Sequence, residues 1–384
     1  MNRTVYTLCT VQFSDAIGLG LLLPILPFWI QEYGASPAQV TQLVALYAAM
    51  GVVFSPITGR LSDLLSRKSI TLVATLGMAI AYLSFLYVET LSEIFLLRAI
   101  TGIMASKAGV VSAWLLGSVH EAERSRYLGL LGSMTGVGML LGPLLASAIL
   151  QTTPAGAYAP VFVCAGCLSA AAALVLLAVP ESKDHTRLKL PVIESRSRDH
   201  LDLLLLNFSL FLVFSVVLSV SALYMQHQLV WDARAAGLAI GGMTGCMAIC
   251  RIWLAHRVIG LLGKVRTAGY FTAASAICLG LCVTTQQPIF FLGLYFLCAM
   301  CYAIAAICIT VLMADRVPEQ TLGTAVGRLN AVSSAAIVLG AGTHGYLFSE
   351  YGPPTPFLLY GLLVVVIACG WCLKNRNRIQ EEIA

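Results

Sequence analysis

The sequence predicts an all-α membrane protein whose twelve transmembrane helices form two six-helix bundles. Three observations lead to this fold class: the composition, the spacing of the apolar blocks and an internal repeat. Apolar residues make up 59% of the 384 residues and charged residues only 11%, whereas soluble domains carry about 25% charged residues. A soluble chain of this length needs more charge to cover its surface, so a bilayer is the expected solvent.

Twelve apolar blocks are long enough to cross a membrane. A spanning helix needs roughly 20 mostly apolar residues, because the hydrocarbon core is about 30 Å thick. The blocks lie at 5–29, 39–58, 69–88, 92–117, 127–150, 159–179, 202–225, 236–256, 267–285, 288–313, 325–349 and 355–373. The first is too long for a cleaved signal sequence, and Pro24 and Pro27 stand where a small-residue cleavage site is expected. We therefore expect it to be the first transmembrane helix.

The positive charges predict the orientation. Most of the 23 Lys and Arg lie near the two ends of the chain or in alternate loops, and the other set of loops holds one, Arg234. Because cytoplasmic loops are enriched in Lys and Arg, both termini are predicted to be cytoplasmic. An odd number of helices would break this alternation. The expected location is the bacterial cytoplasmic (inner) membrane, as a multi-pass protein surrounded by lipid.

The two halves of the chain resemble each other. Pairs that match at an offset of 198 residues include Gly129 with Gly327, Leu141-Gly142 with Leu339-Gly340, and Lys68-Ser69 with Arg266-Thr267. Matches in this order at one offset argue for duplication. A central polar stretch divides the blocks six and six, so the predicted domains are 1–180 and 202–384, joined by a cytoplasmic linker at 181–201. Paired bundles of this kind are typical of secondary transporters, which rock one half against the other.

The loop between the second and third blocks reads Gly59-Arg60-Leu61-Ser62-Asp63-Leu64-Leu65-Ser66-Arg67-Lys68-Ser69. It resembles the cytoplasmic signature of the major facilitator superfamily, in which Gly, Asp, Gly, Arg and Arg/Lys recur at this spacing. The resemblance implies a conformational latch made by four residues: Gly59, Asp63, Arg67 and Lys68. Asp63 can sit against a helix N-terminus or pair with an Arg; alternatively, these are only solvated positive-inside charges. Ser66 replaces the usual Gly, and the matching second-half loop at 257–267 lacks the acid.

Other segments resemble the twelve-helix drug:proton antiporters of this superfamily, especially the tetracycline-efflux branch. The matching segments are Asp15 to Pro27, Leu46-Tyr47-Ala48, Phe54-Ser55-Pro56 and Arg98-Ala99-Ile100-Thr101-Gly102. The fifth block, with Gly138, Gly142 and Pro143, resembles the antiporter motif of exporters. Its spacings Gly132 to Gly136 and Gly138 to Gly142 permit close helix contact. The branch usually has an acid in the third helix, where this chain has Ala81, which argues against a metal-chelated tetracycline as substrate.

Three ionisable residues within the spans are candidates for the transport mechanism, because such groups are costly in a bilayer. Asp15 is the only acid near the middle of a span, and a carboxylate balanced between desolvation and a facing cation can take and release a proton. Arg98 matches the fourth-helix Arg that, by resemblance, takes part in proton coupling. Lys107 is predicted to lie near the depth of Asp15, so it either pairs with Asp15, attracts an anionic substrate or packs as a neutralised residue. A fixed structural salt bridge is the alternative role of Asp15.

Uncharged polar groups complete the predicted substrate cavity. Gln12, Gln42 and Tyr47 lie in the first two spans, and His344 lies well inside the eleventh, where it can titrate near neutrality or simply pack. The second half contributes few charges, so its cavity face is expected to be apolar and aromatic.

These features predict a proton-driven exporter of amphipathic, drug-like compounds that needs no cofactor beyond the proton gradient. The alternative is an exporter of a specific endogenous, possibly anionic metabolite such as a siderophore; a receptor or scaffold is disfavoured by the duplication. The expected partners are a small-molecule substrate, protons and lipid, without nucleic acid, and the protein is expected to work as a monomer. We expect no enzymatic activity and no metal site, since no nucleophile–base pair, metal cluster or phosphate loop appears.

Overall fold

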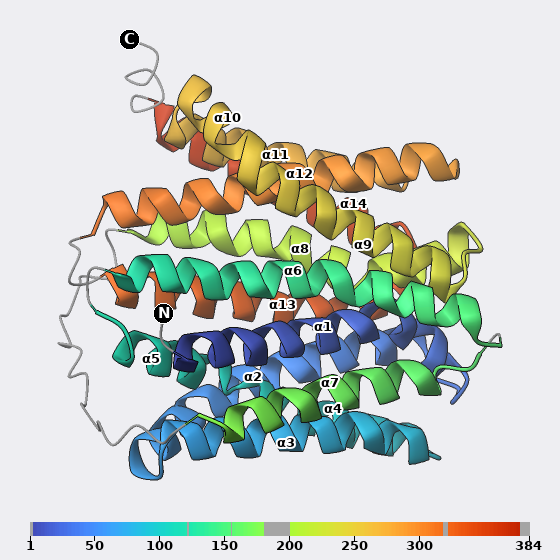
Figure 1. Cartoon of the computed structure of the whole chain (residues 1–384). Coiled ribbons are helices and arrows are strands. Elements are labelled where there is room, and N and C mark those ends of the chain that lie inside the picture. The colour runs from blue at the N-terminus through green and yellow to red at the C-terminus, as the bar shows by residue number, and fades with distance from the viewer. Residues whose placement is uncertain (1–2, 121–122, 155, 180–199, 318–321, 377–384) are drawn as a thin grey trace. The chain divides into compact units, whose positions relative to one another are not determined.

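A computed structural model describes the chain except residues 1–2, 121–122, 155, 180–199, 318–321 and 377–384. In the described part every regular element is a helix (Figure 1). The helices are α1 (Arg3–Gln31), α2 (Pro37–Leu64), α3 (Arg67–Ser84) with a 3₁₀ turn (Phe85–Tyr87), α4 (Leu91–Ala105), α5 (Ala108–Gly117), α6 (Arg124–Thr152), α7 (Ala159–Leu177), α8 (Leu201–Gln228), α9 (Ala233–Ile249), a π-helical turn (Cys250–Leu254), α10 (Ala255–Leu262), α11 (Lys264–Cys282), α12 (Pro288–Asp315), α13 (Leu322–Tyr351) and α14 (Thr355–Lys374). Within these residues they make twelve segments long and apolar enough to span a membrane, which confirms the predicted fold class.

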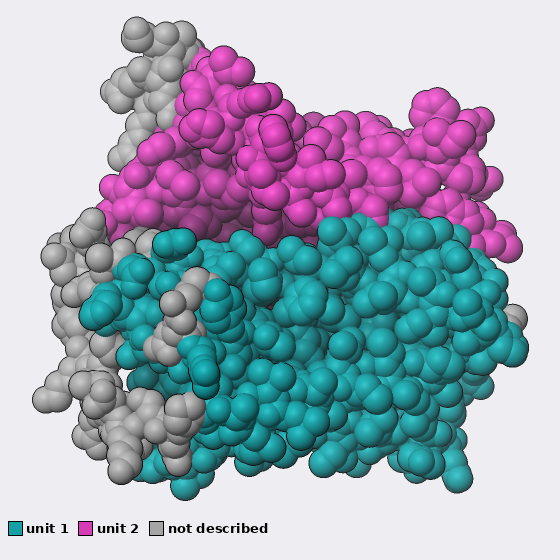
Figure 2. Space-filling view, in the orientation of Figure 1, with its two compact units in different colours: residues 1–35, 46–190, 232–241 teal, residues 36–45, 191–231, 242–384 magenta. Residues whose placement is uncertain are grey.

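The described chain divides into two compact units, coloured separately in Figure 2. The first comprises residues 1–35, 46–190 and 232–241, and the second comprises 36–45, 191–231 and 242–384. Each unit is therefore built mainly from one half of the chain. The first unit also includes the start of α9 (232–241), and the second includes the start of α2 (36–45). Almost all of the predicted linker at 181–201 lies outside the described residues.

Both units use the same internal packing scheme. In the first, α1 packs against α6, and α3 packs against α7. In the second, α8 packs against α13, and α11 packs against α14. These helices hold the same positions in the two predicted sets of six, so each unit repeats one arrangement of its first, third, fifth and sixth spans. This is the packing expected of a duplicated bundle.

The fourth span is broken, although one helix was predicted over 92–117. α4 ends at Ala105 and α5 begins at Ala108, so Ser106 and Lys107 form a turn inside the membrane segment. The Ser106 hydroxyl bonds the carbonyl of Ile103 and lies 2.6 Å from the Thr58 hydroxyl of α2. A serine that bonds its own backbone competes with the helical pattern. The break thus lies between Arg98, which is on α4, and α5.

The eighth span is longer than the predicted 236–256. It continues from α9 through the π-helical turn Cys250–Leu254 into α10, which ends at Leu262. Gly263 then adopts φ 81°, a left-handed conformation that glycine tolerates. Such π turns occur mostly as single turns inside α-helices.

Candidate transport site

An ion pair lies in the interior of the first unit. The ammonium nitrogen Nζ of Lys107 is 2.9 Å from the carboxylate oxygen Oδ1 of Asp15. The Lys107 side chain is fully buried, and the Asp15 side chain is 18% exposed. The sequence suggested this pair because the two residues lie at similar depths in their spans, and the structure contains it. The role of the two residues in transport remains a prediction.

The break in the fourth span positions the lysine. Lys107 is the residue that precedes α5, and its carbonyl accepts the hydrogen bond of the Val111 amide. The opposing carboxylate comes from α1, whose neighbouring residues Ser14 and Ala16 are buried. Asp15 is thus presented from a helix interior, and Lys107 from the residue just before a helix start.

The electrostatics of this pair make it sensitive to protonation. Removing two charges from water costs several kcal/mol for each, and only their mutual attraction offsets that cost. If the carboxylate is neutralised, Lys107 remains as a fully buried ammonium ion without its counterion. The arrangement can therefore convert the binding of one proton into a large change in the free energy of the site.

Arg98 has a different environment. Its side chain is 1% exposed, and its guanidinium carbon lies 4.5 Å above the ring centre of Tyr47. Its Nε and Nη1 atoms are buried without a hydrogen-bond partner among the described residues. The structure therefore brings Arg98 next to Tyr47 and not to a carboxylate, and its predicted part in proton coupling remains a prediction.

The predicted polar cavity residues are divided between the two units. The Gln12 amide donates to the Thr135 hydroxyl of α6 at 3.1 Å, one helical turn before Asp15. Gln42 is exposed and belongs to the second unit, as does His344. Only Gln12 and Tyr47 therefore share the first unit with the ion pair.

His344 belongs to α13 and is fully buried, with its ring facing α8 and α14. Its Nδ1 lies 2.8 Å from the Ser219 hydroxyl, and its ring meets the Tyr360 ring edge-on with centres 4.5 Å apart. Because Ser219 donates its own proton to the Ser215 carbonyl, it accepts from Nδ1. The other ring nitrogen, Nε2, then has a bare lone pair and is buried without a partner in the described structure.

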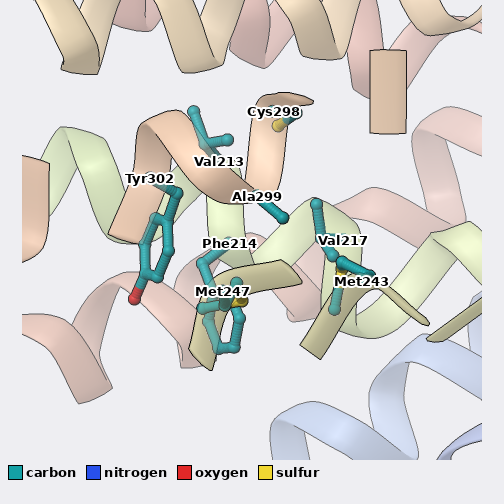
Figure 3. A pocket seen from close by; sticks show the side chains of 8 residues that line it. All are labelled: Val213, Phe214, Val217, Met243, Met247, Cys298, Ala299 and Tyr302. Carbon is teal, nitrogen blue, oxygen red and sulfur yellow. The ribbon is translucent and has the colours of Figure 1, made fainter. Parts of the chain in front are cut away.

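An apolar cavity of about 10 Å³ lies in the second unit, between α8, α9 and α12 (Figure 3). Its lining consists of Val213, Phe214, Val217, Met243, Met247, Cys298, Ala299 and Tyr302. The rings of Phe214 and Tyr302 stack with their centres 4.8 Å apart. Methionine side chains are flexible and fill irregular spaces. This wall fits the expectation that the second half presents an apolar and aromatic face.

The cations of the predicted latch cap helix ends. The Arg67 guanidinium donates to the Ala113 carbonyl at 3.1 Å, near the end of α5. The Lys68 ammonium bonds the carbonyls of Leu177 and Val179 at the end of α7. Unpaired carbonyls at a helix C-terminus attract cations. These residues therefore tie three helices together within the first unit. Asp63 is exposed on α2, and the Gly59 carbonyl accepts the hydrogen bond of the Ser62 hydroxyl within the same helix.

Of the two glycine pairs in the fifth span, only one makes a close helix contact. A Cβ atom on Gly142 would lie 2.6 Å from the Cα of Gly20, and one on Gly138 would lie 2.6 Å from the Cβ of Ala16. Gly132 and Gly136 would meet nothing within 4 Å, so the expected contact is absent there. Pro143 approaches Gly20 from the same helix. The antiporter-motif glycines thus seat α6 against the stretch of α1 that follows Asp15.

Sequence reasoning missed two ion pairs at helix ends of the second unit. Lys264 and Asp315 are 2.6 Å apart, and Arg316 contacts both oxygens of Asp202 at 2.8 and 3.0 Å. The acid that the second-half loop lacks is thus supplied by the end of α12. The signal was available as charges next to the ends of apolar blocks, but their pairing depends on the tertiary packing.

Twelve spans and a set of charges buried among them define a multi-pass membrane protein of the transporter class. A family model described as Major Facilitator Superfamily matches residues 8–260 and 203–382. The chain belongs to this superfamily and is a transporter of small molecules, not an enzyme.

Curated relatives carry the names of resistance proteins. The chain is 27% identical over 306 residues to the tetracycline resistance protein, class D, of Salmonella ordonez, covering 76% of each protein. It is 38% identical over 148 residues to the class H protein of Pasteurella multocida, a match that covers 38% of this chain and 37% of that protein. It is 26% identical over 147 residues to the quinolone resistance protein NorA of Staphylococcus aureus, covering 37% of each.

Solved structures agree on the fold. A bacterial homologue of the human lysosomal transporter Spinster matches with a TM-score of 0.76 at 14% identity, covering 99% of this chain and 97% of that one. A D-xylose–proton symporter matches with a TM-score of 0.74 at 16% identity, covering 96% of both chains. At these identities the likeness concerns the fold alone.

Proposed function

We propose that this chain exports small amphipathic compounds in exchange for protons, with Asp15 as the proton-carrying group. The observation that carries the proposal is the Asp15–Lys107 pair, in which a partly accessible carboxylate holds a fully buried ammonium ion. An acid in this position is costly unless it is paired. Its protonation state therefore controls whether the buried ammonium of Lys107 has a counterion.

The coupling follows from the charges. A proton that enters through the exposed edge of Asp15 breaks the ion pair, and Lys107 then needs either water or another anion. The break between α4 and α5 lets the lysine-bearing segment shift without bending a continuous helix. When the carboxylate next faces the side of lower proton activity, it releases its proton and the pair forms again. This cycle couples proton flow to a change in access to the site.

The substrate class rests on the relatives and on the second unit. The relatives are named for resistance to tetracycline and to quinolones, which are compounds with fused aromatic rings and polar groups. The apolar cavity lined by Met243, Met247 and Phe214 has a volume of about 10 Å³ and is much smaller than such a molecule. The flexible methionine side chains therefore move to admit its apolar part. Ala81, where the tetracycline branch has an acid, argues against a metal-chelated tetracycline.

The proposal includes the orientation and setting predicted from the loop charges. Both termini face the cytoplasm, the protein resides in the bacterial inner membrane, and a monomer suffices for transport. The arginine- and lysine-rich loops support this orientation.

A second candidate function is the proton-driven export of a specific anionic metabolite. Arg98 favours it, because a buried guanidinium without a carboxylate partner gives the interior of the first unit an excess of positive charge. Lys107 could also attract an anionic substrate, but in the structure it forms an ion pair with Asp15.

Everted membrane vesicles from cells that produce the chain test the export function. Respiration makes their interior acidic, so an exporter driven by protons accumulates substrate inside them. Uptake of norfloxacin, ethidium and tetracycline is measured. Uptake is also measured for metabolites secreted by a strain that overproduces this protein. We expect uptake of at least one compound that collapses with a protonophore and is lost in Asp15→Asn. Uptake that survives both the protonophore and the substitution would refute proton coupling.

A further inference from the structure

We propose that the guanidinium of Arg98 is the binding site for a carboxylate-type anionic group on the transported molecule. The inference rests on the proposed export function and names a chemical requirement of its substrate. It concerns a residue that the ion pair does not use and a charge that the protein leaves unbalanced.

The first step is the charge balance. Arg98 is 1% exposed, and its Nε and Nη1 hydrogens find no acceptor among the described residues. Arginine does not shed its proton in proteins, so this charge cannot be removed by titration. The Tyr47 ring, 4.5 Å away, is the partner that the structure provides. Such a contact offsets only part of the free-energy cost of burying a cation without a counterion.

The second step is the absence of a spare carboxylate near Arg98 in the described structure. Asp15 is engaged by Lys107. Glu93, on the same helix as Arg98, accepts hydrogen bonds from the amides of Glu89 and Thr90 and so belongs to the capping box of α4. Asp63 is exposed at the far end of α2. An anion for Arg98 must therefore come from outside this set of residues.

The third step is the access route. Arg98 lies one turn before Gly102, where α2 and α4 approach so closely that a Cβ on Gly102 would be 2.6 Å from the Tyr47 carbonyl. Tyr47 is only partly buried, so the guanidinium lies against the ring of a residue that is itself partly accessible. Rotation of this one side chain replaces a ring face with an incoming carboxylate. The tyrosine therefore covers the anion site between turnovers.

The ligand class follows from the donor. A guanidinium presents parallel N–H groups that match the two oxygens of a carboxylate, and the match is strongest where water is excluded. The unpartnered donors Nε and Nη1 lie on different edges of the guanidinium, so a carboxylate that binds at either one takes Nη2 as its second donor. We thus assign to the substrate an acidic group that the Arg98 guanidinium binds.

Three probes that share one ring system test the assignment. Binding of 2-naphthoate, neutral 2-naphthamide and cationic 2-naphthylmethylammonium to the purified full-length protein is measured by equilibrium dialysis without a proton gradient. We expect the wild-type protein to bind naphthoate at least about tenfold more tightly than naphthamide, because hydrogen bonds to a charged group contribute about 1.5 to 3 kcal/mol. Arg98→Gln should abolish this preference, and Arg98→Lys, which keeps the charge without the fork, should retain part of it.

The controls separate a binding role from a structural one. Arg126 also lies over a tyrosine ring, 6.0 Å from the centre of Tyr127, but is exposed, so Arg126→Gln should keep the full preference. Equal binding of naphthoate and naphthamide by the wild type would overturn the proposal, as would a folded Arg98→Gln or Arg98→Lys variant with the complete preference. Because binding is measured without a gradient, failure of proton-driven uptake in vesicles would refute the export function and leave this result standing.

Discussion

Lys107 Nζ and Asp15 Oδ1 lie 2.9 Å apart, although 92 residues separate them in the chain. The lysine stands at the break of the fourth span, and the aspartate stands in the middle of the first. The pair joins the broken fourth span, made of α4 and α5, to α1. Helix α1 in turn packs along α6. The pair is therefore placed where a change in charge acts on helix packing directly.

The ion pair predicts unequal costs for its two halves. Asp15→Asn leaves a fully buried ammonium ion without a counterion and should lower the free energy of unfolding by about 3 kcal/mol or more. Lys107→Gln leaves a carboxylate that is partly exposed and can take up a proton, so it should cost less. The double variant should recover stability relative to Asp15→Asn. Thermal unfolding of the three purified proteins measures this order, and equal effects of the single changes would argue against a buried pair.

Gly142 predicts a steric effect at the contact between α1 and α6. Gly142→Ala places a methyl group 2.6 Å from the backbone of Gly20 and should destabilise the protein by about 1 to 3 kcal/mol through overpacking. Gly132→Ala is the matched control on the same helix, since nothing lies within 4 Å of its new methyl group. The control should be neutral or slightly stabilising, because alanine is the better helix former. Similar melting temperatures for both variants would contradict the contact.

Lys68 predicts a loss of helix capping. Lys68→Met removes the ammonium that bonds the carbonyls of Leu177 and Val179, and should destabilise the first unit by roughly 0.5 to 1 kcal/mol. Arg60→Met, an exposed cation of the same loop, serves as the control and should have no measurable effect. The decisive measurement is amide hydrogen exchange at the end of α7, which should quicken only in Lys68→Met. Unchanged exchange there would show that the capping contacts contribute nothing.

The contact between Ser219 and His344 should stabilise the folded protein. Ser219→Ala leaves the Nδ1 hydrogen of His344 without an acceptor, which should cost about 1 to 3 kcal/mol. Ser133→Ala, an exposed serine that bonds only its own helix, is the comparison and should be near neutral. Denaturation in detergent compares the two. If the two variants are equally stable, the histidine does not depend on this hydrogen bond, and its role must lie elsewhere.

Much of the fold could be predicted, because a bilayer imposes length and hydropathy on every span. The number of spans follows from these constraints, and the depth of Asp15 and Lys107 in their blocks was enough to suggest a pair. The break at Ser106 was not predictable, since neither Ser106 nor Lys107 is a proline or glycine, and the Thr58 hydroxyl that contacts Ser106 comes from another helix. The sequence around Ser106 does not show that its hydroxyl will contact Thr58 of another helix.

The candidate site shows the same limit. Arg98 was identified by its position in a family motif, but its lack of a carboxylate partner depends on where every acid of the unit lies. The glycine spacing at Gly132 and Gly136 is identical to that at Gly138 and Gly142, yet only the second pair faces α1. Spacing defines which residues share a helix face, whereas the tertiary packing decides which face is covered.

The central claim is that protonation of Asp15 drives export, and proton movement in proteoliposomes tests it most directly. Purified protein is reconstituted around a pH-sensitive dye, and the compound accumulated by everted vesicles is added on one side. We predict a compound-dependent pH change with the wild type, a smaller one with Asp15→Glu and none with a folded Asp15→Asn protein that still binds the compound. A pH change of wild-type size with Asp15→Asn would contradict the account.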